Sequence, residues 1–201
     1  MFMGLVGSEM CIRDSKDTGL RRTFPNMMSR EGAKGQEFNG FMSSKDNNKP
    51  NHTTIIPFTR LLSSPMDYTP GIFNLVDYRY NSPEDRKINP NHRIPSTISK
   101  ELALYVVIYA PVQMAADLPI NYEGNPAFQF ILDVPTDWEV TKVLNGEIGE
   151  FITIARKDIN SDSWYIGSIT NEDGRSIEIE MNFLNDNATY KATIYKDPTN
   201  G

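Results

Sequence analysis

The segment STISKELALYVVIYAPVQMAAD (residues 96–117) contains a pattern typical of a helix, followed directly by a pattern typical of a strand. Ser96 or Thr97 can cap a helix over residues 96–110. Apolar side chains mark one face of this helix, at Leu102, Val106 and Tyr109. The run that follows, 111–117, is short and apolar, and we interpret it as a buried strand. The segment therefore predicts a helix followed by a strand.

The same two signals alternate through the preceding and following sequence. Residues 22–32 are typical of an extended segment, and 52–64 have helical spacing, with Pro57 able to occupy only the first turn. Residues 65–73 indicate a strand end and a turn, and 125–134 indicate a further helix. The order strand, helix, strand, helix, strand, helix is typical of βα repeats on a parallel sheet or barrel.

Three βα units cannot close a (β/α)8 barrel, which takes about 250 residues. We therefore expect residues 16–134 to be the last βα units of a TIM barrel that belongs to a larger enzyme. Beyond them, the apolar pattern changes to a period of two, in four runs at 149–157, 163–170, 176–184 and 190–196. This pattern predicts a small antiparallel β domain over 135–201, truncated at its end, and a fold class of α/β plus all-β.

Composition excludes several classes of partner and site. The 201 residues carry a formal net charge of −6 and no basic cluster, which argues against nucleic-acid binding. The longest apolar run, 102–116, is too short to span a bilayer. The single cysteine, Cys11, leaves no disulfide or thiolate metal site.

The opening MFMGLVGSEMCIRDS (1–15) does not have the features of a signal peptide. It lacks a basic start, a long enough apolar core and a small-residue cleavage site. It is similar to a string that arises when sequencing-adapter bases are translated. We therefore expect residues 1–15 to be non-native.

The stretch SREGAKGQEFNGF (29–41) has the strongest signal for chemistry. Glu31 and Glu37 are interleaved with glycines, which let a loop fold tightly enough for both carboxylates to converge. Two convergent carboxylates suit either calcium binding or acid and base catalysis on a glycosidic bond. Two solvated loop glutamates would give the same spacing.

Other polar residues follow the predicted strands, where barrel enzymes place their sites. Asp67 and Tyr68 follow one strand and Asp117 follows the next, so these residues could bind a polyol by hydrogen bonds and ring stacking. Asp67 could instead be a turn residue, and Asp117 a loop or cap carboxylate. His52 could contact substrate or simply lie in the cap region of a helix.

Several long stretches resemble glycoside hydrolase family 97: LRRTFPNMMSREGAKGQEFNGF (20–41), NHTTIIPFTRLLSSPMDYTPGIF (51–73), STISKELALYVVIYAPVQMAADLP (96–119) and AFQFILDVPTDW (127–138). The tail from VLNGEIGEFITIARK (143–157) is similar to that family's C-terminal β domain. The resemblance implies a calcium-dependent, secreted or periplasmic enzyme that cleaves α-linked oligosaccharides, typical of Bacteroidetes-type glycan use. It also allows a homo-oligomer through the β domain.

The resemblance also implies roles for single residues. Glu37 matches the general acid, which in inverting members also touches the calcium ion, and Glu31 matches a calcium ligand. Arg13 stands where inverting members have a glutamate that serves as base and ligand, so we expect these 201 residues alone to be inactive. The ending PGIF (70–73) is closer to the α-glucosidase type. The alternatives are a retaining α-galactosidase-type member and a non-catalytic carbohydrate-binding or association module.

Overall fold

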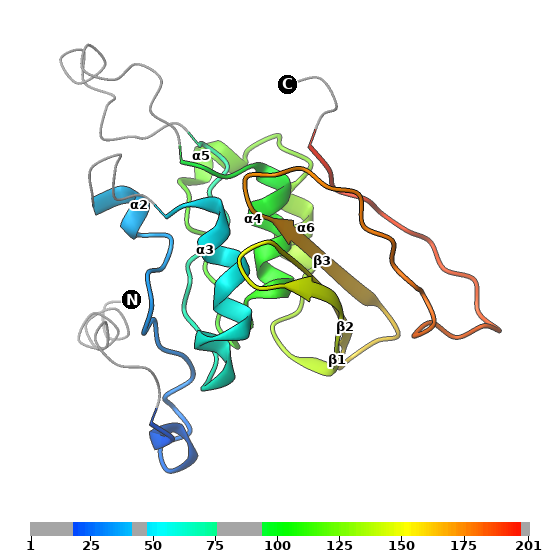
Figure 1. Cartoon of the computed structure of the whole chain (residues 1–201), viewed down its shortest axis with the longest axis horizontal. Coiled ribbons are helices and arrows are strands. Elements are labelled where there is room, and N and C mark those ends of the chain that lie inside the picture. The colour runs from blue at the N-terminus through cyan, green and yellow to red at the C-terminus, as the bar shows by residue number, and fades with distance from the viewer. Residues whose placement is uncertain (1–17, 42–47, 76–93, 198–201) are drawn as a thin grey trace.

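The computed structural model describes residues 18–41, 48–75 and 94–197, and an antiparallel sheet with helices beside it forms its centre (Figure 1). The strands, in sheet order, are β1 (Trp138–Glu147), β2 (Phe151–Asp158) and β3 (Trp164–Thr170). The α-helices are α2 (Phe38–Phe41), α3 (Pro50–Ile55), α4 (Ile98–Val107), α5 (Pro119–Tyr122) and α6 (Phe128–Asp133). Short 3-10 helices are η1 (Leu20–Arg22), η2 (Ile56–Phe58) and η3 (Arg60–Leu62). Within these described ranges, no helix has the length and apolar character needed to cross a membrane.

Helix α4 confirms the strongest helix prediction, although it is shorter than the predicted range. The Thr97 hydroxyl accepts a hydrogen bond from the backbone N–H of Lys100 (3.2 Å) and so caps the first turn. The helix packs against β3 at Gly167, where an added Cβ would lie 2.8 Å from the carbonyl oxygen of Ala103. The missing side chain therefore allows the helix and the sheet to approach closely.

The sheet confirms two of the four predicted strands. Strand β2 lies in the middle and pairs antiparallel with β1 and β3, so the predictions over 149–157 and 163–170 hold with small shifts of boundary. The pairing of β1 is irregular between Trp138 and Val140 and again between Val143 and Asn145. These irregularities interrupt the period of two, which explains why the sequence pattern did not predict β1.

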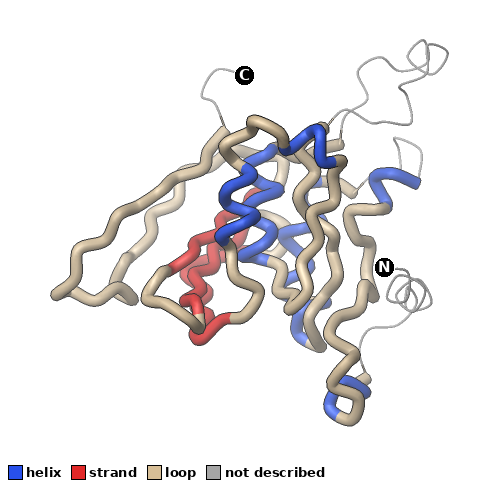
Figure 2. The backbone as a smooth tube through the Cα atoms, turned by 180° about the vertical axis from the view of Figure 1, so that it is seen from behind, coloured by secondary structure: helices blue, strands red, loops and turns tan. Residues whose placement is uncertain are grey.

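The predictions of strands over 176–184 and 190–196 are wrong. Residues 171–197 form no strand and run as a long loop that extends away from the sheet and then returns (Figures 1 and 2). Its contacts include ring packing, with the Phe183 ring 4.7 Å from that of Trp164 and the Tyr195 ring 5.4 Å from that of Phe130, and a hydrogen bond from the Asn145 side chain to the Glu178 carbonyl oxygen (3.3 Å). Alternating apolar residues mark a face, but a strand also needs a partner for its backbone groups.

The helix predicted over 52–64 is broken in three. Helix α3 ends at Ile55, and η2 and η3 follow, with Pro57 in the first turn of η2. Proline has no backbone N–H and its ring crowds the preceding turn, so one continuous helix cannot pass through it. The helix predicted over 125–134 is confirmed as the shorter α6.

Parallel pairing is limited, among the described residues, to a single bridge between Arg30 and Met66. The N–H of Asp67 donates to the Arg30 carbonyl (3.0 Å), and the N–H of Met66 donates to the Tyr109 carbonyl (3.0 Å), so three chain segments lie side by side. The predicted buried strand at 111–117 is wrong, because this stretch is irregular and mostly exposed. The barrel itself therefore stays a prediction.

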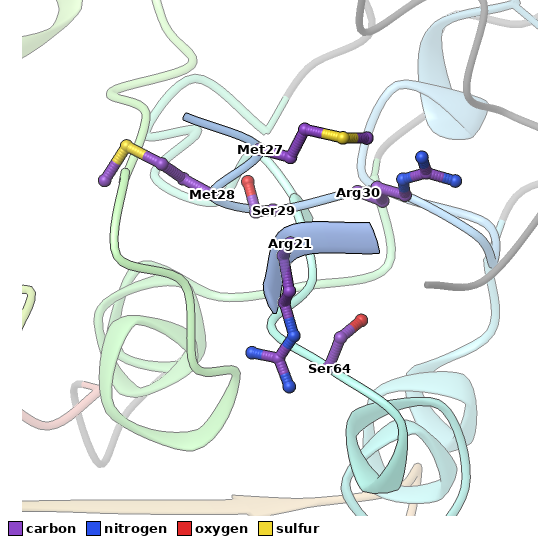
Figure 3. Close-up of a pocket in the computed structure, with 6 residues that line it drawn as sticks. All are labelled: Arg21, Met27, Met28, Ser29, Arg30 and Ser64. Carbon is purple, nitrogen blue, oxygen red and sulfur yellow. The ribbon is translucent and has the colours of Figure 1, made fainter. Parts of the chain in front are cut away.

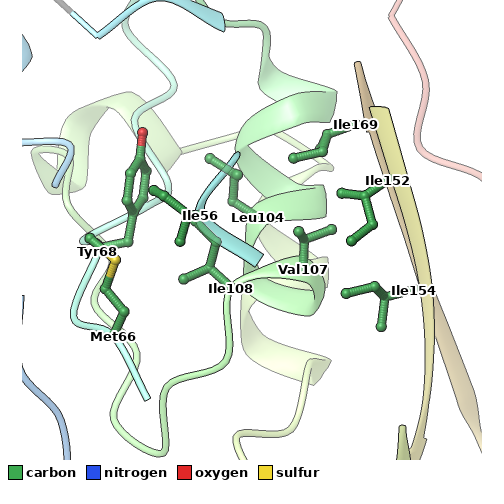
Figure 4. Packing of buried hydrophobic residues seen from close by; sticks show 9 residues of the cluster. All are labelled: Ile56, Met66, Tyr68, Leu104, Val107, Ile108, Ile152, Ile154 and Ile169. Atoms are coloured by element: carbon green, nitrogen blue, oxygen red, sulfur yellow. The ribbon is translucent and has the colours of Figure 1, made fainter. Parts of the chain in front are cut away.

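One apolar core joins the helical region to the sheet (Figure 4). Leu104 and Val107 of α4 pack between Ile152 and Ile154 of β2 on one side and Ile56 on the other. The cluster also contains Met66, Tyr68, Ile108 and Ile169. Packing is therefore continuous across residue 135, where the sequence pattern changes.

Candidate functional site

A buried arginine holds the start of the loop 30–39, which carries both candidate glutamates. The Arg60 guanidinium donates to the carbonyl oxygens of Arg30 (2.8 Å) and Glu31 (3.0 Å). It also donates to the carbonyl oxygens of Ser64 (3.0 Å) and Pro65 (3.2 Å). The five N–H donors of a guanidinium have a fixed geometry, so Arg60 fixes the loop against the segment before Met66.

The other half of the loop is held by a second set of bonds. The Asn48 side chain donates to the Gly35 carbonyl (2.7 Å), and the Asn48 N–H donates to the Asn39 side chain (2.8 Å). The N–H of Gln36 donates to the Tyr68 carbonyl (2.8 Å). Backbone and side-chain contacts thus fix the residues on both sides of Glu37.

The two glutamates differ in their surroundings. Glu31 is half-buried, and its Oε1 accepts a hydrogen bond from the N–H of Gly35 (3.0 Å). An added Cβ at residue 35 would lie 2.9 Å from that oxygen, so glycine makes room for the carboxylate to turn back into the loop. Glu37, directly before α2, is exposed. Glu31 is therefore suited to holding the loop in shape, and Glu37 is suited to contacting a ligand.

His52, Asp67 and Tyr68 lie against the same loop. Nε2 of His52 is 2.8 Å from the Lys34 carbonyl oxygen, and burial lowers the pKa of this imidazole, so it is neutral at pH 7 and donates to that oxygen. Asp67 is tied to the loop through its backbone. Tyr68 is only 3% exposed and belongs to the core, so its ring is placed for packing and not for stacking on a sugar. Substrate contact by His52 and Asp67 stays a prediction, whereas ring stacking by Tyr68 is not supported by its place in the core.

Asp117 lies apart from the loop and organises another turn. Its Oδ2 accepts bonds from the N–H groups of Phe73 (2.8 Å) and Asn74 (2.7 Å), and its Oδ1 accepts from Leu118 (2.8 Å) and the side chain of Asn121 (2.6 Å). It also borders an open pocket of about 710 Å³ over α5 and α6. The bonds match the loop-carboxylate alternative, and a substrate contact stays a prediction.

The sequence interpretation missed Glu101, which is fully buried in the first turn of α4. Burial raises the pKa of its carboxyl, whereas hydrogen bonds from Ser96, Gly71 and Ile72 and the charge of Lys100 lower it. An acidic residue in the first turn is the ordinary sequence signal for a favourable helix-end charge, and it gives no indication of burial. Only the packing of the loop and turn over the helix encloses this carboxylate.

A small pocket lies where the segment before the loop passes Ser64 (Figure 3). It is lined by Arg21, Met27, Met28, Ser29, Arg30 and Ser64. Figure 3 shows the Met27 and Met28 side chains pointing to opposite sides. Its volume of about 10 Å³ is near the minimum for one water molecule, so it is too small for a sugar.

Buried tyrosines make stability fall at alkaline pH. Burial, and then the nearby Glu101, raises the pKa of Tyr68, and burial, then Tyr122 and Glu101, raises that of Tyr105. Because the unfolded tyrosines ionise near pH 10 and the folded ones above it, the contribution of these tyrosines to stability is complete below about pH 10. Above it, each tyrosine costs about 1.4 kcal/mol per pH unit. Burial lowers the pKa of Lys100 to about 8. Because the unfolded lysine keeps its proton up to about pH 10.5, this group makes stability rise with pH between these two values, against the effect of the tyrosines.

We expect the urea midpoint, followed by far-UV circular dichroism, to fall steeply between pH 10 and 11. Tyr105→Phe should flatten this slope, whereas Tyr190→Phe, at a residue that is 41% exposed, should not. Equal slopes for the wild type and Tyr105→Phe would contradict the assignment.

The described residues include ligands of the type that calcium prefers, but too few of them lie together to complete a calcium site. Ca²⁺ takes about six to eight oxygen ligands, and carboxylates are among those it prefers. Glu31 and Glu37 can offer such oxygens, but one Glu31 oxygen already accepts the bond from Gly35. Among residues 18–41, 48–75 and 94–197, no group of three or more His, Cys, Asp or Glu side chains is placed to hold a metal. Arg13 lies outside the described residues.

Residues 137–201 match the family model described as "Glycosyl-hydrolase 97 C-terminal, oligomerisation". The chain is 38% identical over 187 residues to the retaining alpha-galactosidase of Bacteroides thetaiotaomicron, covering 92% of this chain and 27% of that protein. It is 33% identical over 150 residues to a probable retaining alpha-galactosidase of Streptomyces bingchenggensis, covering 74% and 20%.

Solved structures give the same relationship. A glycoside hydrolase family 97 enzyme from Pseudoalteromonas sp. strain K8, solved with panose and with acarbose, is 48% identical, with a TM-score of 0.70. The match covers 86% of this chain and 26% of that one. The chain thus spans about a quarter of the length of these relatives.

Proposed function

Because the chain belongs to glycoside hydrolase family 97, we propose that the full-length protein hydrolyses α-glycosidic bonds with Glu37 as general acid. The observation that carries this proposal is an exposed carboxylate on a loop whose neighbouring residues are fixed. Residues 16–134 would be the last units of a (β/α)8 barrel, and the loop would lie at the end of a barrel strand, where such enzymes place their sites.

A general acid on this loop would protonate the leaving oxygen as the glycosidic bond breaks. Glu37 is exposed, so its carboxyl can reach a bound sugar, while Gln36 beside it is fixed by backbone and side-chain bonds. Proton transfer needs the acid within hydrogen-bond reach of the leaving oxygen. An exposed side chain on a fixed backbone supports such a role for Glu37.

Glu31 and Glu37 would contribute carboxylate oxygens to a calcium ion, with further ligands from outside the described residues. The ion would supply a fixed positive charge close to the substrate. Glu31 would then do two things: it accepts the hydrogen bond from the Gly35 N–H that holds the loop in shape, and it would bind the ion.

Two substrate classes have support. The sequence PGIF and the 48% identity to an enzyme solved with panose, an oligosaccharide of glucose, favour an α-glucosidase type. The curated relatives named as retaining alpha-galactosidases favour the other type equally. We propose the α-glucosidase type, with the retaining α-galactosidase as the second candidate.

The remaining proposals concern the whole protein. Residues 135–201 would form a β domain through which copies associate, supported by the description of the matched model as an oligomerisation domain. The enzyme would be secreted or periplasmic, where α-linked oligosaccharides are available. A non-catalytic association module remains the alternative for the β domain alone.

The test is a substrate panel on the full-length protein. We expect release of p-nitrophenol from its α-glucoside to exceed that from its α-galactoside, and a chelator such as EGTA to lower the rate until calcium is restored. The reverse preference would select the α-galactosidase type, and turnover of neither would contradict the proposed function. These 201 residues alone, assayed in parallel, should show no turnover.

A further inference from the structure

The fully buried Glu101 ties three chain segments together at the base of the loop that carries Glu37. Its Oε1 accepts bonds from the Ser96 hydroxyl (2.5 Å) and the Gln36 side-chain amide (3.2 Å). Its Oε2 accepts bonds from the N–H groups of Gly71 (3.0 Å) and Ile72 (3.3 Å). A single carboxylate thus joins the acid-bearing loop, the turn after Pro70 and helix α4.

The set of donors suits a carboxylate and not an apolar residue. The backbone N–H groups of Gly71 and Ile72 can only donate toward Glu101, and the NH₂ group of the Gln36 side-chain amide donates to it as well. A buried ionisable group is costly, and well-packed apolar residues are often at least as stable in its place. A contribution to stability therefore does not by itself explain why a glutamate occupies position 101. The hydrogen bonds by which it holds neighbouring segments in place explain it better.

The bond to Gln36 connects this network to the residue directly before Glu37. Gln36 is 3% exposed, and both its backbone N–H and its side chain are bonded, to Tyr68 and Glu101 respectively. Glu37 is exposed and extends from the backbone directly after Gln36, so a shift of that backbone would shift its carboxylate as well. A misplacement of about 1 Å in a catalytic group can cost about 100-fold in rate.

We propose that Glu101 is a positioning residue for Glu37, acting through Gln36. This inference rests on the proposed function of Glu37 as general acid. It assigns to the first turn of α4 a role in catalysis that requires no contact with substrate.

The test exchanges the two partners in the full-length enzyme. Glu101→Gln is the conservative variant, because the Gln36 amide can turn its oxygen toward the new NH₂ group, whereas Gln36→Glu is the disruptive variant, because it places two buried carboxylates together. The double variant Gln36→Glu/Glu101→Gln restores an amide–carboxylate pair, because the glutamine oxygen at 101 can face Gly71 and Ile72 while its NH₂ group faces residue 36 and Ser96. Gln36→Met is a milder variant that leaves Glu101 its other three donors.

Two leaving groups distinguish positioning from a general loss of structure. The methyl α-glucoside, or galactoside if that sugar is accepted, needs protonation by the acid, whereas the p-nitrophenyl glycoside needs little. We expect Gln36→Glu and Gln36→Met to lower kcat/KM about 10- to 100-fold on the methyl glycoside and less than about threefold on the aryl glycoside, and Glu101→Gln to have the smaller effect on the methyl glycoside. The double variant should regain most of the loss, and the exposed control Glu178→Gln should change neither substrate.

Equal losses on the two substrates, or a folded double variant without recovery, would overturn the inference. Glu37→Gln separates this failure from failure of the proposed function. If Glu37→Gln shows the leaving-group dependence and Gln36→Glu and Gln36→Met do not, only the positioning role is wrong. If Glu37→Gln lacks it as well, Glu37 is not the acid, and both proposals fall.

Discussion

Replacing Glu37 with glutamine in the full-length enzyme is expected to lower kcat/KM for a methyl α-glycoside by about 10²- to 10⁴-fold, the usual contribution of a general acid. Glutamine keeps the size of the side chain and its exposed position before α2, but it cannot transfer a proton to the leaving oxygen. The loss should be much smaller on the p-nitrophenyl glycoside, whose leaving group departs without full protonation.

The measurement is initial rates on both substrates, with Glu178→Gln as a matched substitution at another exposed glutamate. Because Glu37 is also a proposed calcium ligand, the assay should be repeated over a range of calcium concentrations. Activity recovered by excess calcium would show that the substitution had removed a ligand and not the acid. Unchanged activity on the methyl glycoside would remove Glu37 from the mechanism.

Replacing Arg60 with methionine is expected to lower the free energy of unfolding by about 3–5 kcal/mol. The side chain is 7% exposed, and its guanidinium satisfies the carbonyl oxygens of Arg30, Glu31, Ser64 and Pro65. Each buried acceptor that loses its donor costs about 1–3 kcal/mol, and two of these four keep a second donor, the Asp67 N–H for Arg30 and the Ser64 hydroxyl for Pro65. The loop start would also lose its attachment to the segment before Met66.

Urea unfolding of the 201-residue chain, followed by circular dichroism, measures this loss. Arg22→Met is the matched control, since Arg22 is exposed on η1 and its replacement should change stability little. Arg60→Lys should lie between the two, because an ammonium keeps the charge but cannot reproduce the guanidinium fork. Equal unfolding midpoints for Arg60→Met and Arg22→Met would contradict the structural role of Arg60.

Helices and strands with both a pattern and a local stop signal could be predicted from the sequence. Helix α4 has a capping threonine and an apolar face, and β2 and β3 have alternation bounded by turns. The failures share one cause, since 176–184 and 111–117 have suitable side chains but form no backbone ladder with a neighbouring strand in the described structure, the Ala116 N–H making a single bond to the Pro70 carbonyl. Strand pairing depends on what lies alongside, and a local pattern does not contain that information.

The candidate site could be predicted in part for a similar reason. Glycine spacing around Glu31 indicated a tight loop, and the structure shows Gly35 making room for the Glu31 carboxylate. The same reasoning could not separate Tyr68, a core residue, from an exposed aromatic ring. Nor could it find Glu101, whose partners lie up to 65 residues away along the chain.

By itself, then, the sequence determined the family, the capped helix, the two regular strands and the loop that carries both glutamates, because each of these is encoded in neighbouring residues. Only the tertiary structure decided which polar groups are buried and what they hold. Arg60 and Glu101 look like ordinary surface charges in the sequence, yet packing encloses both. Once enclosed, each must bond to the backbone around it, and those bonds set the shape of the loop.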